Sequence, residues 1–169
     1  GTGVCQHSRA NDTWTEPPGL VNAGYSNGAF AVFAGTAGTV TVDNSLGQVT
    51  AGGMQFATGG YTITGGGVAL TGGQATIRVG DGSTAGAGYT ATINAALSGA
   101  SELVKTDAGT LVLGGTNSYT GGTRITGGTV QIASDANLGA TASGVTLDGG
   151  TLATSATLTS ARNVNLLGT

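Results

Sequence analysis

Short runs of alternating apolar and polar residues fill most of the chain. Val40 and Val42 alternate with threonines, and so do Tyr61 and Ile63. The same period of two recurs at Ile77 and Val79, Leu111 and Leu113, Val130 and Ile132, Val145 and Leu147, and Val164 and Leu166. A period of two that is rich in β-branched residues predicts half-buried β-strands. No window of eleven or more residues places apolar side chains at helical spacing, so the pattern predicts an all-β fold.

Glycine clusters separate these runs at short, nearly regular intervals. They stand at Gly52-Gly53, Gly59-Gly60, Gly65-Gly66-Gly67 and Gly72-Gly73, and again at Gly114-Gly115, Gly121-Gly122 and Gly127-Gly128. Six or seven residues leave room for a strand of about four residues and one corner. Three such sides make a coil of roughly 20 to 25 residues, so the chain holds on the order of seven coils.

We therefore predict a right-handed parallel β-helix, in which each coil pairs with the next at about 4.8 Å. A β-sandwich or barrel is the structural alternative. It is less favoured because the glycine doublets recur faster than the interval of about 8 to 12 residues that is usual between sandwich strands. The segment before Gly24 lacks the alternation. We expect residues 1–24 to form an irregular segment or a cap of the first coil, and residues 25–169 to form the β-helix.

Composition agrees with a thin core of small side chains. The 169 residues include 34 glycines and 29 threonines, while 8% are charged and 5% are aromatic. Such a chain lacks the bulky residues for one thick core, but it is too rich in alternating Val, Ile and Leu to be disordered. Stacked coils that each bury one row of small apolar residues fit this composition.

One stretch of the chain carries a more specific pattern. It fixes Leu103, Lys105, Ala108-Gly109-Thr110-Leu111, Leu113, Gly115, Asn117, Tyr119-Thr120-Gly121-Gly122-Thr123, Ile125 and Gly127-Gly128-Thr129. This pattern resembles the passenger-associated transport repeat of bacterial autotransporters. Asp107-Ala108 near an expected glycine and Val130 in place of a leucine are mild departures from it.

The resemblance implies a β-helical passenger that crosses the outer membrane of a Gram-negative bacterium with the C-terminal barrel of the same precursor. It implies a cell-surface or secreted location and a structural stalk, with adhesion or self-association as its role and with the repeat aiding folding and export. Host-surface protein, host glycan and a second copy are the partners expected. A signal peptide, a barrel and an apolar run of about 18 residues are absent, so we expect one piece of a longer chain.

The charge pattern argues against two classes of partner. The formal net charge is −3, the pI is near 4.7, and the five basic residues are scattered. Nucleic acids and anionic membrane surfaces need clustered Lys and Arg, so neither is expected, and direct membrane insertion is not expected either. The single cysteine, Cys5, excludes an internal disulfide framework.

A search for catalytic chemistry finds no constellation. His7 lies near Cys5, but a metal site needs three or four ligands. The carboxylates weighed for glycoside chemistry are Asp43, Asp81, Glu102, Asp107, Asp135 and Asp148. Turns at the corners explain Asp81, Asp135 and Asp148 through Asx hydrogen bonds. We therefore predict no enzyme, catalytic residue, metal or cofactor. A carbohydrate-active β-helical enzyme, of the polysaccharide lyase or hydrolase type, is the alternative.

Trp14 stands with Pro17-Pro18 in the segment without alternation. Two interpretations are open for this cluster. It is either a patch that stacks on a sugar or binds a partner, or a cover for the exposed end of the first coil. The second interpretation is favoured, because the terminal coil of a solenoid otherwise offers unpaired backbone to another chain.

Overall fold

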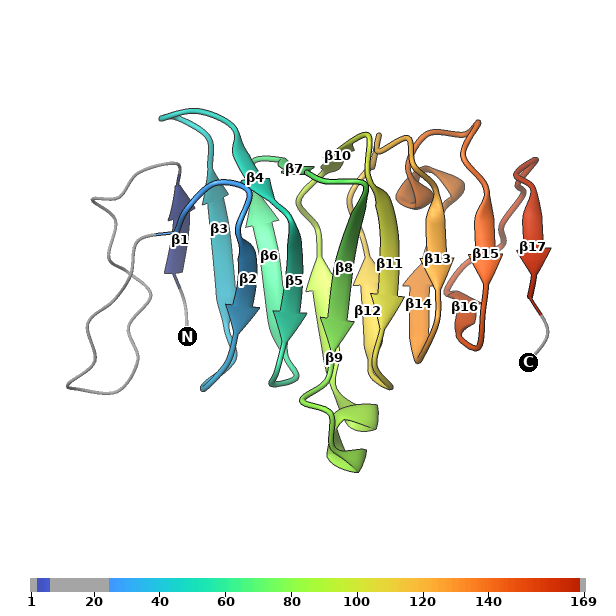
Figure 1. The fold of residues 1–169 in the computed structure, drawn as a ribbon, viewed down its shortest axis with the longest axis horizontal. Helices are drawn as coiled ribbons and strands as arrows, with labels where there is room; N and C mark the ends of the chain where they lie inside the picture. The colour runs from blue at the N-terminus through green and yellow to red at the C-terminus, as the bar shows by residue number, and fades with distance from the viewer. Residues whose placement is uncertain (1–2, 7–24, 168–169) are drawn as a thin grey trace.

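The computed structural model describes residues 3–6 and 25–167, and their strands stack in parallel along one axis (Figure 1). Sheet A contains β1 (Gly3–Gln6), β3 (Thr39–Asp43), β6 (Tyr61–Gly65), β9 (Thr90–Ile93), β12 (Thr110–Leu113), β14 (Thr129–Ile132) and β16 (Thr151–Thr154). Sheet B contains β2 (Phe30–Phe33), β5 (Gly53–Phe56), β8 (Gln74–Val79), β11 (Glu102–Thr106), β13 (Thr123–Ile125), β15 (Val145–Leu147) and β17 (Val164–Leu166). The short sheet C contains β4 (Val49–Ala51), β7 (Val68–Leu70) and β10 (Leu97–Gly99).

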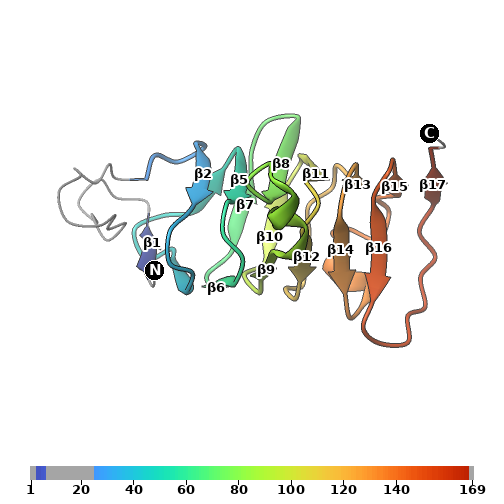
Figure 2. The same ribbon diagram turned by 90° about the horizontal axis from the view of Figure 1, so that it is seen from below.

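The chain forms a β-solenoid, because it returns to the same sheet once per coil and pairs in parallel each time. Thr39 of β3 pairs with Thr62 of β6, so residues 39–61 make one coil. Thr110 of β12 pairs with Thr129 of β14, so residues 110–128 make a shorter one. The predicted all-β fold of stacked parallel coils is confirmed, and Figure 2 shows the strands ordered from β1 to β17 along the rod.

The coil between β6 and β9 contains the short 3-10 helix η1 (Thr84–Gly88), which projects beyond the strands between β8 and β9 (green in Figure 1). A second such helix, η2 (Asp135–Leu138), follows β14. Both are too short for any apolar periodicity to reveal them. Within the described residues no helix has the length and apolarity to cross a membrane.

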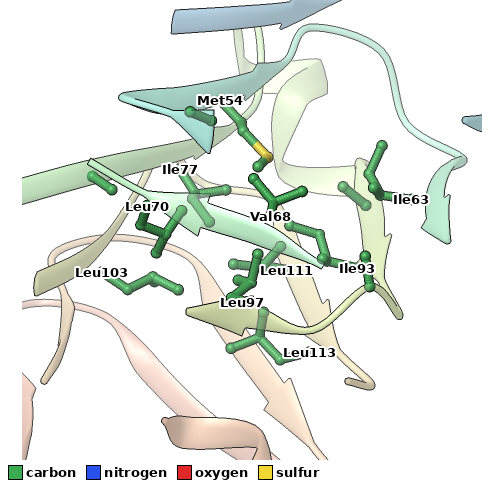
Figure 3. Close-up of a cluster of buried hydrophobic side chains, with 14 of the residues drawn as sticks. Met54, Ile63, Val68, Leu70, Ile77, Ile93, Leu97, Leu103, Leu111 and Leu113 are labelled. Atoms are coloured by element: carbon green, nitrogen blue, oxygen red, sulfur yellow. The ribbon is translucent and has the colours of Figure 1, made fainter. Parts of the chain in front are cut away.

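Inward-facing side chains form continuous rows from coil to coil. One row runs through Val40, Ile63, Ile93, Leu113 and Ile132, which are register partners and at most 3% exposed. Figure 3 shows members of this row pointing toward Val68, Leu70 and Leu97 of sheet C. Burying each aliphatic side chain contributes about 1.5–3 kcal/mol, so the thin core gains its stability from repetition.

Burial is incomplete at the last coil. Val164 and Leu166 alternate as predicted, but they are 53% and 74% exposed. Strand β17 pairs only with β15 in the described part of the chain. The alternation therefore predicts the strand correctly, whereas burial also requires a coil stacked on each side.

The N-terminal segment contains one strand that the pattern does not indicate. Gly3–Gln6 form β1, which pairs in parallel with β3 and places Cys5 in the core. Four residues are too few to establish a period. Residues 7–24 lie outside the part of the chain that the structure describes. The predictions for His7, Trp14 and Pro17-Pro18 fall on these residues and stay predictions.

Candidate functional site

The stretch that resembles the transport repeat occupies one coil and the first two strands of the next. Leu103 and Lys105 lie on β11, Thr110 to Leu113 form β12, and Thr123 and Thr129 begin β13 and β14. Its leucines point into the core, and Thr110 and Thr129 lie side by side on the outer face of sheet A. No strand is assigned between β12 and β13. That side still pairs with β10, since the Ser118 and Thr120 amides donate to Leu97 and Gly99 carbonyls at 2.8 and 2.9 Å.

Lys105 is fully buried in an otherwise apolar row. Its register partners on the neighbouring coils are Ile77 and Ile125. The Nζ group donates to the carbonyl oxygens of Thr106 and Asp107 at 2.8 Å each and to that of Gly127 at 3.2 Å. Burial lowers the pKa of Lys105 to about 8, although the negative charge of Asp107 raises it in part. The ammonium thus caps a corner of its own coil and links it to the next coil.

Asn117 forms the second buried polar contact of the repeat. Its Oδ1 accepts the Leu97 amide at 2.8 Å, and its Nδ2 donates to the Asn137 carbonyl at 2.6 Å. The Asn137 side chain in turn donates to the Gly115 carbonyl at 2.8 Å. Asn117 therefore binds the backbone of the coil before it and of the coil after it, which fixes the register of three coils.

Tyr119 closes the same side of the coil. Its ring is completely buried, and its hydroxyl is 2.7 Å from the hydroxyl of Thr123, which is also buried. Burial raises the pKa of Tyr119 to about 12. A buried tyrosine needs a partner for its hydroxyl. The Tyr-x-x-x-Thr spacing of the repeat supplies that partner within one corner.

Two glycines of the repeat are required by close backbone approach. A Cβ on Gly128 would lie 2.3 Å from the Gly109 oxygen, and its φ of +61° lies in the left-handed region. A Cβ on Gly121 would lie 2.3 Å from the Glu102 nitrogen. No side chain fits at those distances without moving the backbone. These glycines therefore set how closely adjacent coils stack.

Arg162 is a buried polar anchor that the sequence analysis does not single out. Its side chain is 1% exposed. It donates to the carbonyl oxygens of Asp135, Leu138, Gly139, Ala140 and Ser143, and its Nε donates to Asp135 Oδ1 at 2.8 Å. This guanidinium holds the loop around η2. Local sequence gives no signal for this role, because the partners of the guanidinium lie 19 to 27 residues earlier in the chain.

Asn137 was also missed, although its position carried a signal. Asn137 comes one coil length after Asn117, because both this pair and the register partners Leu103 and Thr123 are 20 residues apart. When the same polar residue returns one coil later in a glycine-rich corner, the two side chains are therefore expected to stack in a buried ladder. A search for local motifs alone passes over it.

The carboxylates are dispersed along the rod. Asp81 accepts the Ser83 amide at 2.9 Å, which is the predicted Asx turn, and hydrogen bonds from Ser83 lower the pKa of Asp81. Asp148 instead pairs with Arg124, whose Nε lies 3.1 Å from Oδ2, and Asp135 with Arg162. The turn interpretation was therefore incomplete for Asp135 and Asp148, because a partner one coil away is invisible to local spacing.

The other three carboxylates weighed above also have hydrogen-bond or ion-pair partners. Asp107 Oδ2 lies 3.1 Å from Arg78 Nη2, Glu102 accepts from Gln74, and Asp43 accepts the Ser45 amide. No three His, Cys, Asp or Glu side chains within residues 3–6 and 25–167 lie close enough to hold a metal ion. The described carboxylates therefore serve coil stacking and turns.

Taken together, a parallel solenoid with buried polar corners and one glycine-rich repeat coil defines a repeat protein of the β-solenoid class. A family model for the passenger-associated-transport-repeat matches residues 103–132. The chain is 60% identical over 168 residues to the protein named "Adhesin BmaC autotransporter" from Brucella suis biovar 1 (strain 1330). That alignment covers 99% of this chain and 5% of the relative, so the chain spans about one twentieth of the relative's length. No solved structure matches the chain.

These residues belong to the passenger domains of bacterial autotransporters and carry the transport repeat at 103–132. A passenger lies at the cell surface or is released outside the Gram-negative outer membrane, and that is the location of these residues. The resemblance inferred from the sequence is confirmed. The pattern that carried it corresponds to the coil in which the structure buries Lys105, Asn117, Tyr119 and Thr123.

Proposed function

We propose that these residues build a length of stalk in a surface-exposed adhesin. The observation that carries the proposal is the unbroken parallel pairing of the two seven-stranded sheets. Such a rod extends by about 4.8 Å per coil. It therefore separates whatever precedes it from whatever follows it by a fixed distance, without an active centre of its own.

The repeat at 103–132 has a second role in this proposal, which is to aid folding and export. Apolar rows tolerate slippage between similar coils, but Lys105 and Asn117 each require particular backbone partners. A coil with buried polar groups therefore offers a template of defined register to its neighbours. During export such a template lets the emerging chain stack correctly outside the cell.

Adhesion is the activity that we propose for the whole precursor. The relative's name, adhesin, supports it, and the described carboxylates of this chain pair with nearby residues instead of converging in a groove. The partners in this proposal are a host-surface protein or glycan, or sister cells. The C-terminal outer-membrane barrel of the same precursor is the partner in export.

Two deletions of one coil each test the export role in the full-length precursor. Leu103 pairs with Thr123, so removing 103–122 joins residues at equivalent positions of successive coils. Gly53 pairs with Thr76, so removing 53–75 is the matched control in an upstream coil. Each deletion shortens the rod by about 4.8 Å and keeps the strands in phase.

Surface display is measured with antibody on intact cells, against the total precursor in lysates. We expect the 103–122 deletion to lower display at unchanged total precursor and the 53–75 deletion to preserve it. Equal display of both variants would contradict an export role for the repeat. Adherence of displaying cells to cultured host cells tests the adhesive role separately, and undiminished adherence of cells that lack the whole precursor would contradict that role.

A further inference from the structure

The loop around η2 encloses a buried site that is lined by hydrogen-bond acceptors. The oxygen atoms that converge there are Asp135 Oδ1 and the backbone carbonyl oxygens of Asp135, Leu138, Gly139, Ala140 and Ser143. The guanidinium of Arg162 fills the space between them. Its Nη1 donates to three of these oxygens, its Nη2 to two and its Nε to one. We call these six oxygen atoms the η2 site.

The η2 loop is also held by contacts in which Arg162 takes no part. Asn137 Nδ2 donates to the Gly115 carbonyl at 2.8 Å, and the Ala140 amide donates to the Tyr119 carbonyl at 2.9 Å. Both acceptors belong to the preceding coil, within the transport repeat. The oxygens of the η2 site are therefore positioned by the coil beneath them, and the site keeps its shape when the guanidinium leaves.

The segment that carries Arg162 is attached to the rod at few points. Residues 155–163 run without a strand from β16 to β17, as Figure 2 shows. The ends of this segment, Ser155 and Asn163, hydrogen-bond to backbone of the preceding coil. Between these ends, in a segment that the structure describes throughout, only Ser160 and Arg162 hydrogen-bond to that coil. We call residues 155–163 the strap.

We propose that the η2 site is a preformed guanidinium-binding site, and that Arg162 is its tethered ligand, which fastens the strap to the rod. An empty site would leave buried carbonyl oxygens without a donor, which is unfavourable. A free alkylguanidinium should therefore enter the site once the Arg162 side chain is removed. The Asp135 carboxylate adds a charge-assisted hydrogen bond to such a ligand.

Other cations match the η2 site less well. A guanidinium spreads its N–H donors over a plane, and the oxygens of the site are divided among all three of its nitrogens. A metal ion or an ammonium group is a point charge and cannot serve all of these oxygens together. The proposal goes beyond the stalk and adhesion proposed above, because a rod of stacked coils stands without it.

Removing the Arg162 side chain tests the η2 site directly. Methylguanidinium chloride is titrated into the Arg162→Ala variant of the full 169-residue chain, and the backbone amide signals of residues 134–144 are followed by NMR. Arg124→Ala is the matched control, since Arg124 also pairs with an aspartate, Asp148, but its side chain is 37% exposed. Sodium chloride and urea at equal concentrations control for ionic strength and for denaturation.

We expect saturable shifts at residues 134–144 in Arg162→Ala, and none in the unaltered chain or in Arg124→Ala, because Arg162 fills the site in both. Adding Asp135→Asn to Arg162→Ala should weaken methylguanidinium binding about tenfold, because a charged acceptor makes the stronger hydrogen bond.

The tether is tested by proteolysis of the strap. Thermolysin cuts before leucine, and Leu158 is half-buried in the strap. Cleavage there should be about tenfold faster in Arg162→Ala than in the unaltered chain, because the strap opens locally more often. Methylguanidinium should leave that cleavage fast, since a free ligand fills the site without fastening the strap.

A folded Arg162→Ala variant without saturable shifts would overturn the binding site, and so would equal shifts with sodium chloride or urea. Cleavage of Arg162→Ala at the rate of the unaltered chain would overturn the tether. If Arg162→Ala does not fold alone, refolding in methylguanidinium replaces the titration. Recovery with methylguanidinium but not with sodium chloride would then support the site, and recovery with neither would overturn it.

Discussion

The coils before residue 80 and the coils after residue 100 share one strand pattern but fill their interiors differently. The upstream core stacks Phe33 on Phe56 with ring centroids 4.8 Å apart and packs Tyr61 against both. In the described residues every buried polar or charged residue lies beyond residue 100: Ser101, Lys105, Asn117, Thr123, Asn137, Ser143 and Arg162. The same solenoid is therefore held by apolar stacking at one end and by buried hydrogen bonds at the other.

The difference teaches that coil formation and coil register have separate causes. Alternating Val, Ile and Leu suffice to build a coil, and an apolar row accepts several neighbours equally well. A buried amide or ammonium accepts only the neighbour that satisfies it, because an unpaired polar group in the core costs about 1–3 kcal/mol. Polar corners thus give up some apolar packing for a defined register, and in the described residues they begin at Ser101, just before the transport repeat.

The largest effect is expected from Gly128→Ala. The new Cβ would lie 2.3 Å from the Gly109 oxygen at a φ of +61°, so the polar corner must open. We expect the free energy of unfolding to fall by about 3 kcal/mol, measured by urea denaturation. Gly73→Ala is the control, since no heavy atom lies within 4 Å of its added Cβ and the effect should stay within about 0.5 kcal/mol. Equal effects would show that the close approach at Gly128 is not required.

A smaller loss is expected from Lys105→Met, which keeps the side-chain length and removes the ammonium. Three carbonyl oxygens lose their donor, so stability should fall by about 2 kcal/mol in the same measurement. Ile77→Met at the register partner is the control and should cost less than about 1.5 kcal/mol. A more stable Lys105→Met variant would mean that the buried charge is retained for register at the expense of stability.

Phe56→Leu probes the upstream core on the other side of the comparison. It removes the ring stacked on Phe33 but leaves no polar group unpaired, so the loss should be about 1 kcal/mol. Thermal unfolding followed by circular dichroism measures it. If Phe56→Leu lowered stability more than Lys105→Met does, the apolar stacking upstream would stabilise the solenoid more than the buried ammonium.

A pH dependence at Lys105 probes the same buried group by titration. The folded pKa of about 8 lies below the unfolded value of 10.5, so the unfolded chain holds more protons at this site between those limits. The contribution of Lys105 to stability should therefore rise as the pH increases from about 8 to about 10. Urea midpoints of the unaltered chain and of Lys105→Met, compared across that range, isolate the slope. Parallel pH profiles would contradict a lowered pKa.

Much of the fold could be predicted from the sequence, because the alternation at Val40, Ile63 and Leu113 directly reflects which side chains face the core. The site was harder to predict. The repeat pattern included Lys105 and Asn117, yet no spacing rule indicates that their polar atoms bind backbone of adjacent coils. Arg162 and Asn137 were missed because their partners lie about one coil away, and only coil-length recurrence connects such residues.

The stacking of coils along the rod also has a mechanical consequence. A pull on the two ends acts across the sheets, so it detaches one coil after another instead of shearing all strands together. Each detached coil of about 20 residues releases roughly 70 Å of chain. A stalk of this kind yields in steps and dissipates work under load.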